Sequence, residues 1–225
     1  MINLYNLLQN DTDQFPFPWN STRDRNPCPW KGVTFNFNNS ITQFSFQYFS
    51  LSRPDFLPVL FQIRTLESID LSNNKLSSIP SGFMTGCGNL ISLGNNRLNG
   101  TIPSSSFRSL PNLIYLELHN NNLGGSIPPE LGFCKNLAAL NLAENQLAGV
   151  LPVELGNLSV LQELKLQANN LAGEMPIEMT GLRGLRKLNI SWNSLNGSIP
   201  SAISRLHNLN NLEQFPGSII SITWI

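Results

Sequence analysis

Six asparagines recur along the chain at an almost fixed interval, and each stands two residues before a leucine. Their successive spacings are 22, 25, 24, 24 and 24 residues. A unit of this length cannot bury its apolar edge alone, so neighbouring copies must stack. The 225-residue chain is therefore predicted to form an elongated solenoid. The six asparagines are Asn74, Asn96, Asn121, Asn145, Asn169 and Asn193.

Leucines at fixed offsets before each asparagine mark a short strand. In the repeat 161–184, Leu164 and Leu166 alternate with polar residues, which places both leucines in the core. The pattern L-x-x-L-x-L-x-x-N-x-L is that of a leucine-rich repeat. We predict an α/β-type leucine-rich repeat solenoid with a parallel inner sheet and 3-10 or irregular segments on the convex side. The predicted strands are 66–71, 91–93, 114–118, 138–142, 162–166 and 186–190, all in one sheet.

The recurring asparagine has a physical role in this pattern. A side-chain amide both donates and accepts hydrogen bonds, so stacked copies can satisfy buried backbone groups as a ladder. We predict that five ladder asparagines are buried and bonded to backbone: Asn74, Asn121, Asn145, Asn169 and Asn193.

The second repeat is two residues short. Counted forward from Cys87, it opens at Leu90; counted backward from Asn96, its core pair is Ile91 and Leu93. A slip of one residue would turn leucines to solvent, whereas convex loops tolerate deletions. We therefore predict that the strand keeps its register, that Leu90 leaves the opening position, and that the connection 80–89 runs tighter. Ser92 and Gly94 should then face outward. The alternative is a broken strand with Leu90 in the opening position.

Composition excludes several function classes. The 14 basic and 14 acidic residues cancel, so no electrostatic footprint points to nucleic acid or an anionic membrane. No apolar run reaches the roughly 18 residues of a spanning helix. The first ten residues lack the features of a signal peptide. His119 and His207, the two histidines, have no convergent partners in their segments. We expect no enzyme activity, no metal site and no cofactor.

The three cysteines form no C-x-x-C motif. Cys87 and Cys134 hold equivalent places two repeats apart, which separates them by about 10 Å, beyond disulfide reach. Both are predicted to be small buried hydrophobes.

Side chains that point out of the predicted strands form the candidate binding surface. Tyrosine, tryptophan and charged groups gathered on one concave face suit the recognition of a protein or peptide. The alternative is a merely solvated strand face, with Glu163 and Lys187 paired across adjacent strands. The candidate ligand-binding residues are Tyr115, Glu117, His119, Asn141, Glu144, Glu163, Lys165, Gln167, Lys187 and Trp192.

A second motif, Leu-x-Gly-x-Ile-Pro, follows the asparagine, as in Leu98–Pro103 and Leu195–Pro200. It resembles the plant-specific class of extracellular leucine-rich repeats. Upstream, Asn26-Pro-Cys-Pro-Trp-Lys-Gly-Val-Thr-Phe35 resembles the N-terminal cap of plant receptor-like kinases and receptor-like proteins. The resemblance implies a helical cap over residues 1–40, a solenoid of about seven repeats over 41–212 and a non-repeat tail over 213–225.

The same resemblance implies a function. The family's ectodomains bind peptide or protein ligands and co-receptor ectodomains outside the cell, and a membrane helix and often a kinase follow. Here Phe35 replaces the cap's second cysteine, so Cys28 is expected to be unpaired. The kinase, the membrane helix and a signal peptide are missing, so we expect an N-terminal fragment of a plasma-membrane receptor. The alternatives are a secreted soluble inhibitor or decoy and a truncated product without function.

The chain contains seven Asn-x-Ser/Thr triplets, the acceptor motif for N-glycosylation, and these support an origin in the secretory pathway. A glycan at Asn189 would obstruct the predicted concave face. The seven sites are Asn10, Asn20, Asn38, Asn99, Asn157, Asn189 and Asn196.

Overall fold

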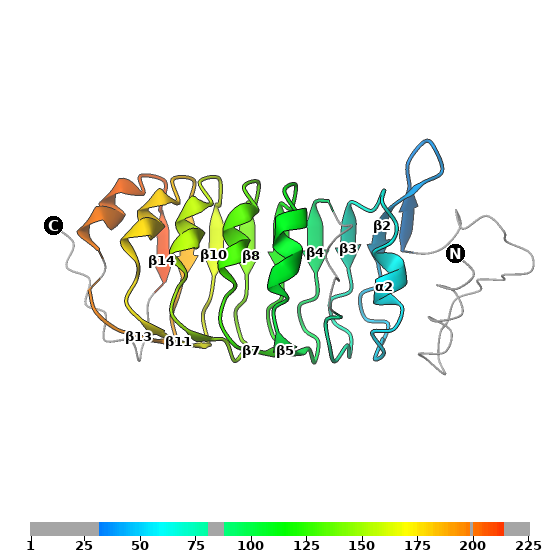
Figure 1. Ribbon diagram of the computed structural model, residues 1–225, viewed down its shortest axis with the longest axis horizontal. Coiled ribbons are helices and arrows are strands. Elements are labelled where there is room, and N and C mark those ends of the chain that lie inside the picture. The colour runs from blue at the N-terminus through cyan, green and yellow to red at the C-terminus, as the bar shows by residue number, and fades with distance from the viewer. Residues whose placement is uncertain (1–31, 81–87, 199, 214–225) are drawn as a thin grey trace, which may run out of the picture.

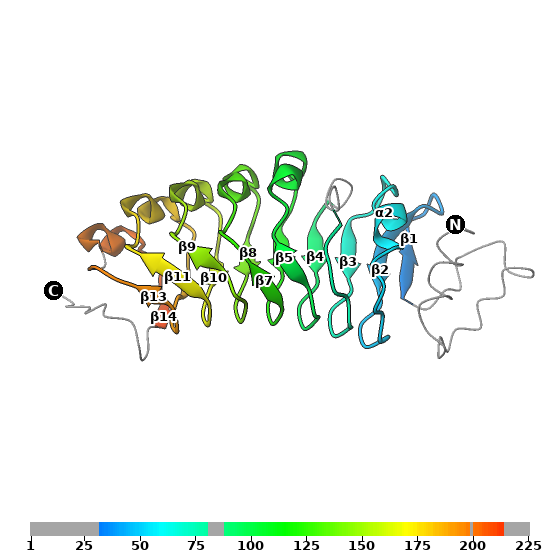
Figure 2. The same ribbon diagram turned by 60° about the horizontal axis from the view of Figure 1, so that its bottom comes forward.

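The computed structural model describes residues 32–80, 88–198 and 200–213. These residues form an elongated solenoid in which one turn follows the next along the long axis (Figure 1). Strands line one side and short helices the outer side of the curve (Figure 2). The predicted leucine-rich repeat solenoid is confirmed.

The principal sheet has nine strands within the described residues, and it runs along the whole solenoid. From β2 to β14 all neighbouring strands are parallel, and β1 is antiparallel to β2. The six predicted strands are confirmed: five have shorter bounds, and the strand predicted at 91–93 lies one residue earlier, at Leu90–Ser92. In order, the nine are β1 (Val33–Phe35), β2 (Ile41–Ser45), β3 (Ser68–Asp70), β4 (Leu90–Ser92), β6 (Tyr115–Glu117), β8 (Ala139–Asn141), β10 (Glu163–Lys165), β12 (Lys187–Asn189) and β14 (Asn211–Glu213).

The core consists mainly of leucine side chains, which become buried when each turn of the solenoid packs against the next. Leu164 and Leu166 are completely buried, as predicted, and their counterparts in neighbouring repeats are equally buried. At the N-terminal end, larger side chains replace leucine: Phe46 makes edge-on contacts with Phe44 and Phe49. The aromatic cluster fills the turn in which Phe49 stands in place of the ladder asparagine.

The convex side carries 3-10 helices rather than long helices. Each begins after a proline in the extended conformation, which cannot donate an N–H and so suits a helix start. One short α-helix, α2 (Leu57–Leu60), occupies the corresponding place in the first turn. The 3-10 helices are η1 (Ser104–Ser109), η2 (Pro129–Phe133), η3 (Val153–Asn157), η4 (Ile177–Gly181) and η5 (Ser201–Arg205).

The Leu-x-Gly motif makes further strands on the flank of the solenoid, which the sequence did not predict. Gly173 takes a positive φ of 80°, and a Cβ there would lie 3.0 Å from the Val150 side chain of the preceding repeat. Glycine therefore permits both the turn and the close stacking. The flank strands are β5 (Asn99–Thr101) with β7 (Asn122–Gly124), and β9 (Ala148–Gly149) with β11 (Asn170–Gly173) and β13 (Ser194–Leu195).

A β-hairpin covers the N-terminal edge of the principal sheet. Val33 pairs with Phe44 and Phe35 with Ile41, with a register shift between Thr34 and Phe35. Residues 32–40 of the predicted cap are thus strand and turn. The helix predicted for the cap, together with Cys28, lies outside the described residues.

The second repeat keeps its strand in register, as predicted. Ile91 pairs with Ile69 and Leu116 in the core column, and Leu93 is fully buried. Leu90 pairs with Ser68 in an outward position, and Gly88 takes the opening place that Leu66 holds one turn earlier. The shortened connection falls largely on residues 81–87, outside the described part.

Cys134 is a buried free thiol, as predicted for a small hydrophobe. Burial in the apolar core raises the pKa of this thiol to about 11. Its sulfur lies 3.7 Å from the carbonyl oxygen of Phe107 in the preceding turn. Cys87 lies outside the described residues.

Candidate recognition surface

The outward side chains of the principal sheet stand in columns, because from β2 to β14 every strand pairs with its neighbour without a register shift. One column contains Leu90, Tyr115, Ala139, Glu163 and Lys187. The next contains Asp70, Ser92, Glu117, Asn141, Lys165 and Asn189. The two columns include six of the candidate ligand-binding residues: Tyr115, Glu117, Asn141, Glu163, Lys165 and Lys187. Whether these side chains bind a ligand stays a prediction.

The asparagine ladder fixes the edge of this surface. The Asn169 amide nitrogen lies 3.0–3.4 Å from the carbonyl oxygens of Leu142, Leu166 and Gln167, and its oxygen accepts the Leu147 N–H at 2.9 Å. Asn74, Asn121 and Asn193 are likewise buried and bonded to backbone. The prediction needs one correction: Asn145 makes the same bonds but is only half-buried, as is Asn96.

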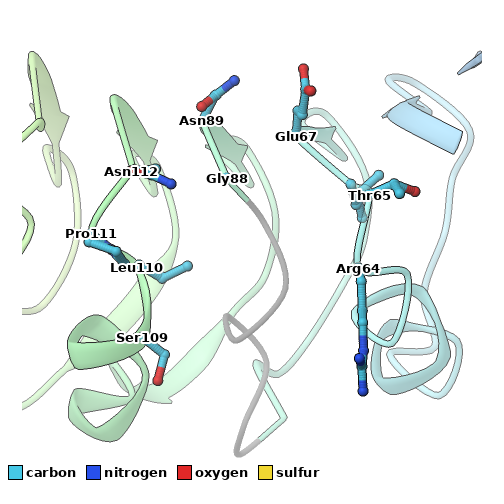
Figure 3. A pocket seen from close by; sticks show the side chains of 10 residues that line it. Arg64, Thr65, Glu67, Gly88, Asn89, Ser109, Leu110, Pro111 and Asn112 are labelled. Atoms are coloured by element: carbon cyan, nitrogen blue, oxygen red, sulfur yellow. The ribbon is translucent and has the colours of Figure 1, made fainter. Parts of the chain in front are cut away.

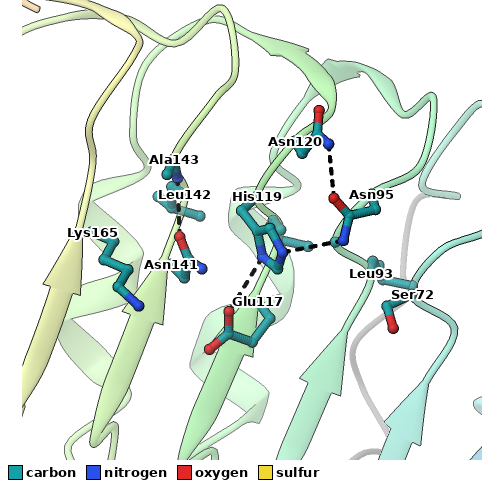
Figure 4. Close-up of polar contacts among 12 residues, drawn as sticks. Ser72, Leu93, Asn95, Glu117, His119, Asn120, Asn141, Leu142, Ala143 and Lys165 are labelled. Atoms are coloured by element: carbon teal, nitrogen blue, oxygen red, sulfur yellow. Dashed lines mark hydrogen bonds and ion pairs between the residues drawn. The ribbon is translucent and has the colours of Figure 1, made fainter. Parts of the chain in front are cut away.

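His119 sits at the centre of a polar cluster (Figure 4). Its Nδ1 lies 3.4 Å from a Glu117 carboxylate oxygen, and its Nε2 lies 3.5 Å from the Asn95 amide nitrogen. Asn120 donates in turn to the Asn95 oxygen at 2.8 Å. The cluster links two consecutive repeats, which are also joined here by the Asn95 N–H donating to the His119 carbonyl at 2.9 Å. Among the described residues, the buried His119 Nδ1 has no hydrogen-bond partner.

The imidazole of His119 lies over Gly94, which the sequence analysis placed on the outward face but did not include among the candidate ligand-binding residues. Gly94 stands under the imidazole, and a Cβ on it would come within 2.3 Å of the ring. Asn95 was also missed, because both residues act through a neighbouring repeat. The signal was available in principle: Gly94 interrupts a column that otherwise carries side chains at Ser72 and Ser191.

A charged cluster lies two strands further along. The Lys165 ammonium is 2.7 Å from a Glu163 carboxylate oxygen, and Lys187 is 3.9 Å from the same oxygen. The closer pair lies along one strand, and the expected pair across adjacent strands is the longer one. Because these groups are partly exposed, each pair contributes little to stability, on the order of 0.2–1 kcal/mol. This cluster contains two cations and one anion, whereas the candidate residues together include three acids and two bases.

Two large aromatic side chains project from the same face. Tyr115 is 46% exposed and Trp192 is 59% exposed. Trp192 also has a positive φ of 54°, a conformation that is uncommon for bulky residues. The equivalent residues Glu144 and Ala168 share this backbone turn. The counterpart of Trp192 in the preceding repeat is thus Ala168, which carries only a methyl group.

The remaining predicted residues support the surface. Asn141 accepts the Ala143 N–H at 3.3 Å, which closes the end of β8 (Figure 4). Glu144 is exposed at the following turn. The Gln167 side-chain oxygen is buried and has no hydrogen-bond partner among the described residues.

A cavity of about 450 Å³ opens on the flank where the second repeat is shortened (Figure 3). On one side the cavity is bordered by Gly88, which has no side chain to fill it, and on the other side by Leu110 and Pro111. Arg64 and Glu67 extend from its margin in opposite directions (Figure 3). The lining mixes charged, polar and apolar residues and includes none of the candidate ligand-binding residues.

Five of the seven glycosylation triplets fall in the described residues. Asn38, Asn99, Asn157 and Asn196 are exposed. Asn189 is half-buried on β12, and its side-chain oxygen accepts both the N–H and the hydroxyl of Ser191, at 3.1 and 2.7 Å. Asn10 and Asn20 lie outside the described residues.

The described residues contain no cluster of three or more histidine, cysteine, aspartate or glutamate side chains that could hold a metal. Within the same residues, no helix is long and apolar enough to cross a bilayer.

Comparison with known proteins agrees with this geometry. Models of the leucine-rich repeat match residues 64–123, 136–158 and 184–206. The chain is 34% identical over 131 residues to Receptor-like protein kinase 5 of Arabidopsis thaliana. That alignment covers 57% of the chain but 13% of the kinase.

Solved structures extend the likeness to nearly the whole chain. The Arabidopsis receptor kinase HAESA, solved with the peptide hormone IDA and the co-receptor SERK1, is 32% identical with a TM-score of 0.76. The match covers 97% of this chain and 41% of that one. The PEPR1–AtPEP1 structure is 27% identical with a TM-score of 0.82, covering 96% and 31%. The chain thus spans well under half of these receptors.

Proposed function

The chain belongs to the plant leucine-rich repeat family of receptor ectodomains, and from this premise we propose that its concave face recognises a peptide or protein ligand outside the cell. In this proposal the chain is the ligand-perceiving part of a cell-surface receptor, and a co-receptor ectodomain is its second partner. The role is recognition without catalysis.

The observation that carries the proposal is the Tyr115 column. From β6 to β12 it presents an aromatic ring, a methyl group at Ala139, an acid at Glu163 and a base at Lys187. Four strands about 4.8 Å apart spread these groups over about 14 Å. Backbone groups of the strands are bonded to each other, so a ligand would meet side chains on a rigid frame.

The HAESA complex supports the nature of the partners, because that receptor was solved with both a peptide and a co-receptor. A mixed surface of rings and opposite charges suits a peptide better than an apolar ligand, since each charge requires a complementary group. Tyrosine and tryptophan supply large contact area with few rotatable bonds.

Panning a phage library of random 12-residue peptides against the chain tests the proposal. Selected peptides should bind the wild type and lose at least tenfold in affinity with Tyr115→Ala or Lys187→Ala. A matched control is Val153→Ala, which removes an exposed apolar side chain from the convex helix η3. Peptides that bind Tyr115→Ala and Lys187→Ala normally, and lose affinity with Val153→Ala, would place the recognition surface elsewhere.

A further inference from the structure

The tip of the β1–β2 hairpin presents a phenylalanine with almost no protein contacts. Phe37 is 95% exposed, more than any other large apolar side chain in the described part of the chain. The next residue, Asn38, begins the triplet that ends at Ser40. Asn38 is exposed, and its side-chain amide makes no hydrogen bond within the described structure. An exposed aromatic ring and an exposed glycan-acceptor amide are therefore consecutive in the sequence of this turn.

The turn that carries both residues is tightly held. The Asn36 side-chain oxygen accepts the N–H groups of Asn38 and Ser40, each at 3.0 Å. The Asn36 N–H donates to the Ser40 carbonyl at 3.0 Å, and Asn39 closes the turn with a positive φ of 57°. Because the backbone is already ordered, a group packed on the turn loses little further entropy.

We propose that Asn38 carries an N-linked glycan whose first sugar packs on the Phe37 ring. In the attachment, the Asn38 amide nitrogen bonds to the sugar's anomeric carbon, that carbon's bond to a lipid pyrophosphate carrier breaks, and the amide loses one proton. A pyranose ring has a face of C–H groups that can cover an aromatic face and remove apolar surface from water. The glycan then stabilises the hairpin that closes the sheet edge. The inference rests on the extracellular placement in the proposed function.

The other triplets lack this combination. Asn99 and Asn196 are exposed, but no large exposed apolar side chain adjoins either in sequence. Asn189 has its side-chain oxygen engaged by Ser191. Glycans at Asn99 or Asn196 should therefore add bulk and solubility without changing stability.

The test is secretion of the full chain, placed behind a cleavable signal peptide, from a plant cell line as wild type, Ser40→Ala, Phe37→Ser and the double variant. Ser40→Ala removes the triplet and leaves both the ring and the asparagine in place. The matched control is Ser198→Ala, which removes the Asn196 triplet. Glycopeptide mass spectrometry measures occupancy, and thermal unfolding gives Tm.

We expect Asn38 to be occupied, and Ser40→Ala to lower Tm by about 2–4 °C, as a loss near 1 kcal/mol would in a chain of this size. Adding Phe37→Ser to Ser40→Ala should change Tm little further, and Ser198→Ala should leave it unchanged. An unoccupied Asn38 beside an occupied Asn99 or Asn196 overturns the site. Independent, additive effects of the two substitutions overturn the packing. Neither readout involves a ligand, so a failure of peptide binding would contradict the proposed function alone.

Discussion

The imidazole of His119 lies directly over Gly94 of the preceding repeat. A Cβ at position 94 would come within 2.3 Å of the ring Cε1 and 2.7 Å of both ring nitrogens. The ring is also held laterally by Asn95 and Glu117. Gly94 thus sets the position of a candidate ligand-contacting side chain that belongs to another repeat.

Gly94→Ala should force the imidazole out of its present position; because that ring is the partly exposed end of a flexible side chain, the chain should lose no more than about 1 kcal/mol of stability. Urea unfolding measures the change. Gly124→Ala is the matched control, because its Cβ would meet its nearest neighbours at 3.9 Å in a strand of the same solenoid. Equal losses for the two variants would show that the His119 contact does not constrain position 94.

Each ladder asparagine satisfies backbone groups of its own repeat and of the preceding one. Asn169→Ala and Asn145→Ala each leave backbone N–H and C=O groups without partners, at a cost of about 1–3 kcal/mol. Asn122→Ala, on the exposed face of β7, is the control and should be nearly neutral. Free energies of unfolding by denaturant decide the matter. Losses near zero at both ladder positions would mean that the ladder is not structural.

Much of the fold could be predicted because leucine alternation alone fixes strand register. Ile91 and Leu93 could be placed in the core of a shortened repeat, because a slip would have turned both to solvent. The flank strands could not be predicted in this way. The residues of Leu-x-Gly have no alternation of their own, and their hydrogen bonds depend on the neighbouring turn.

The sequence predicted which side chains point outward from the strands, but it did not predict the contacts that these side chains make with one another. The positions of Glu117 and Lys165 follow from the repeat, whereas the position of the His119 imidazole depends on Gly94, which lies 25 residues earlier in the sequence. Trp192 was identified by residue type, and its unusual backbone conformation follows from the turn before each ladder asparagine.

Cys134 should make stability depend on alkaline pH. Burial raises the pKa of the folded thiol from 9.0 to about 11, so the folded chain holds a proton that the unfolded chain releases. The contribution is fully present below pH 9 and is lost as pH rises towards 11. Between pH 8 and pH 11 the free energy of unfolding should decrease by about 2 kcal/mol more in the wild type than in Cys134→Ala. Parallel pH profiles for the two proteins would contradict this account.

The concave face as the recognition surface is tested most directly by photo-crosslinking. Benzoylphenylalanine placed at position 115 or 192, and at position 153 of the convex side as control, is irradiated with a selected peptide. The account predicts peptide adducts from positions 115 and 192 that excess unlabelled peptide abolishes, with none from position 153. Adducts from position 153 alone would contradict it.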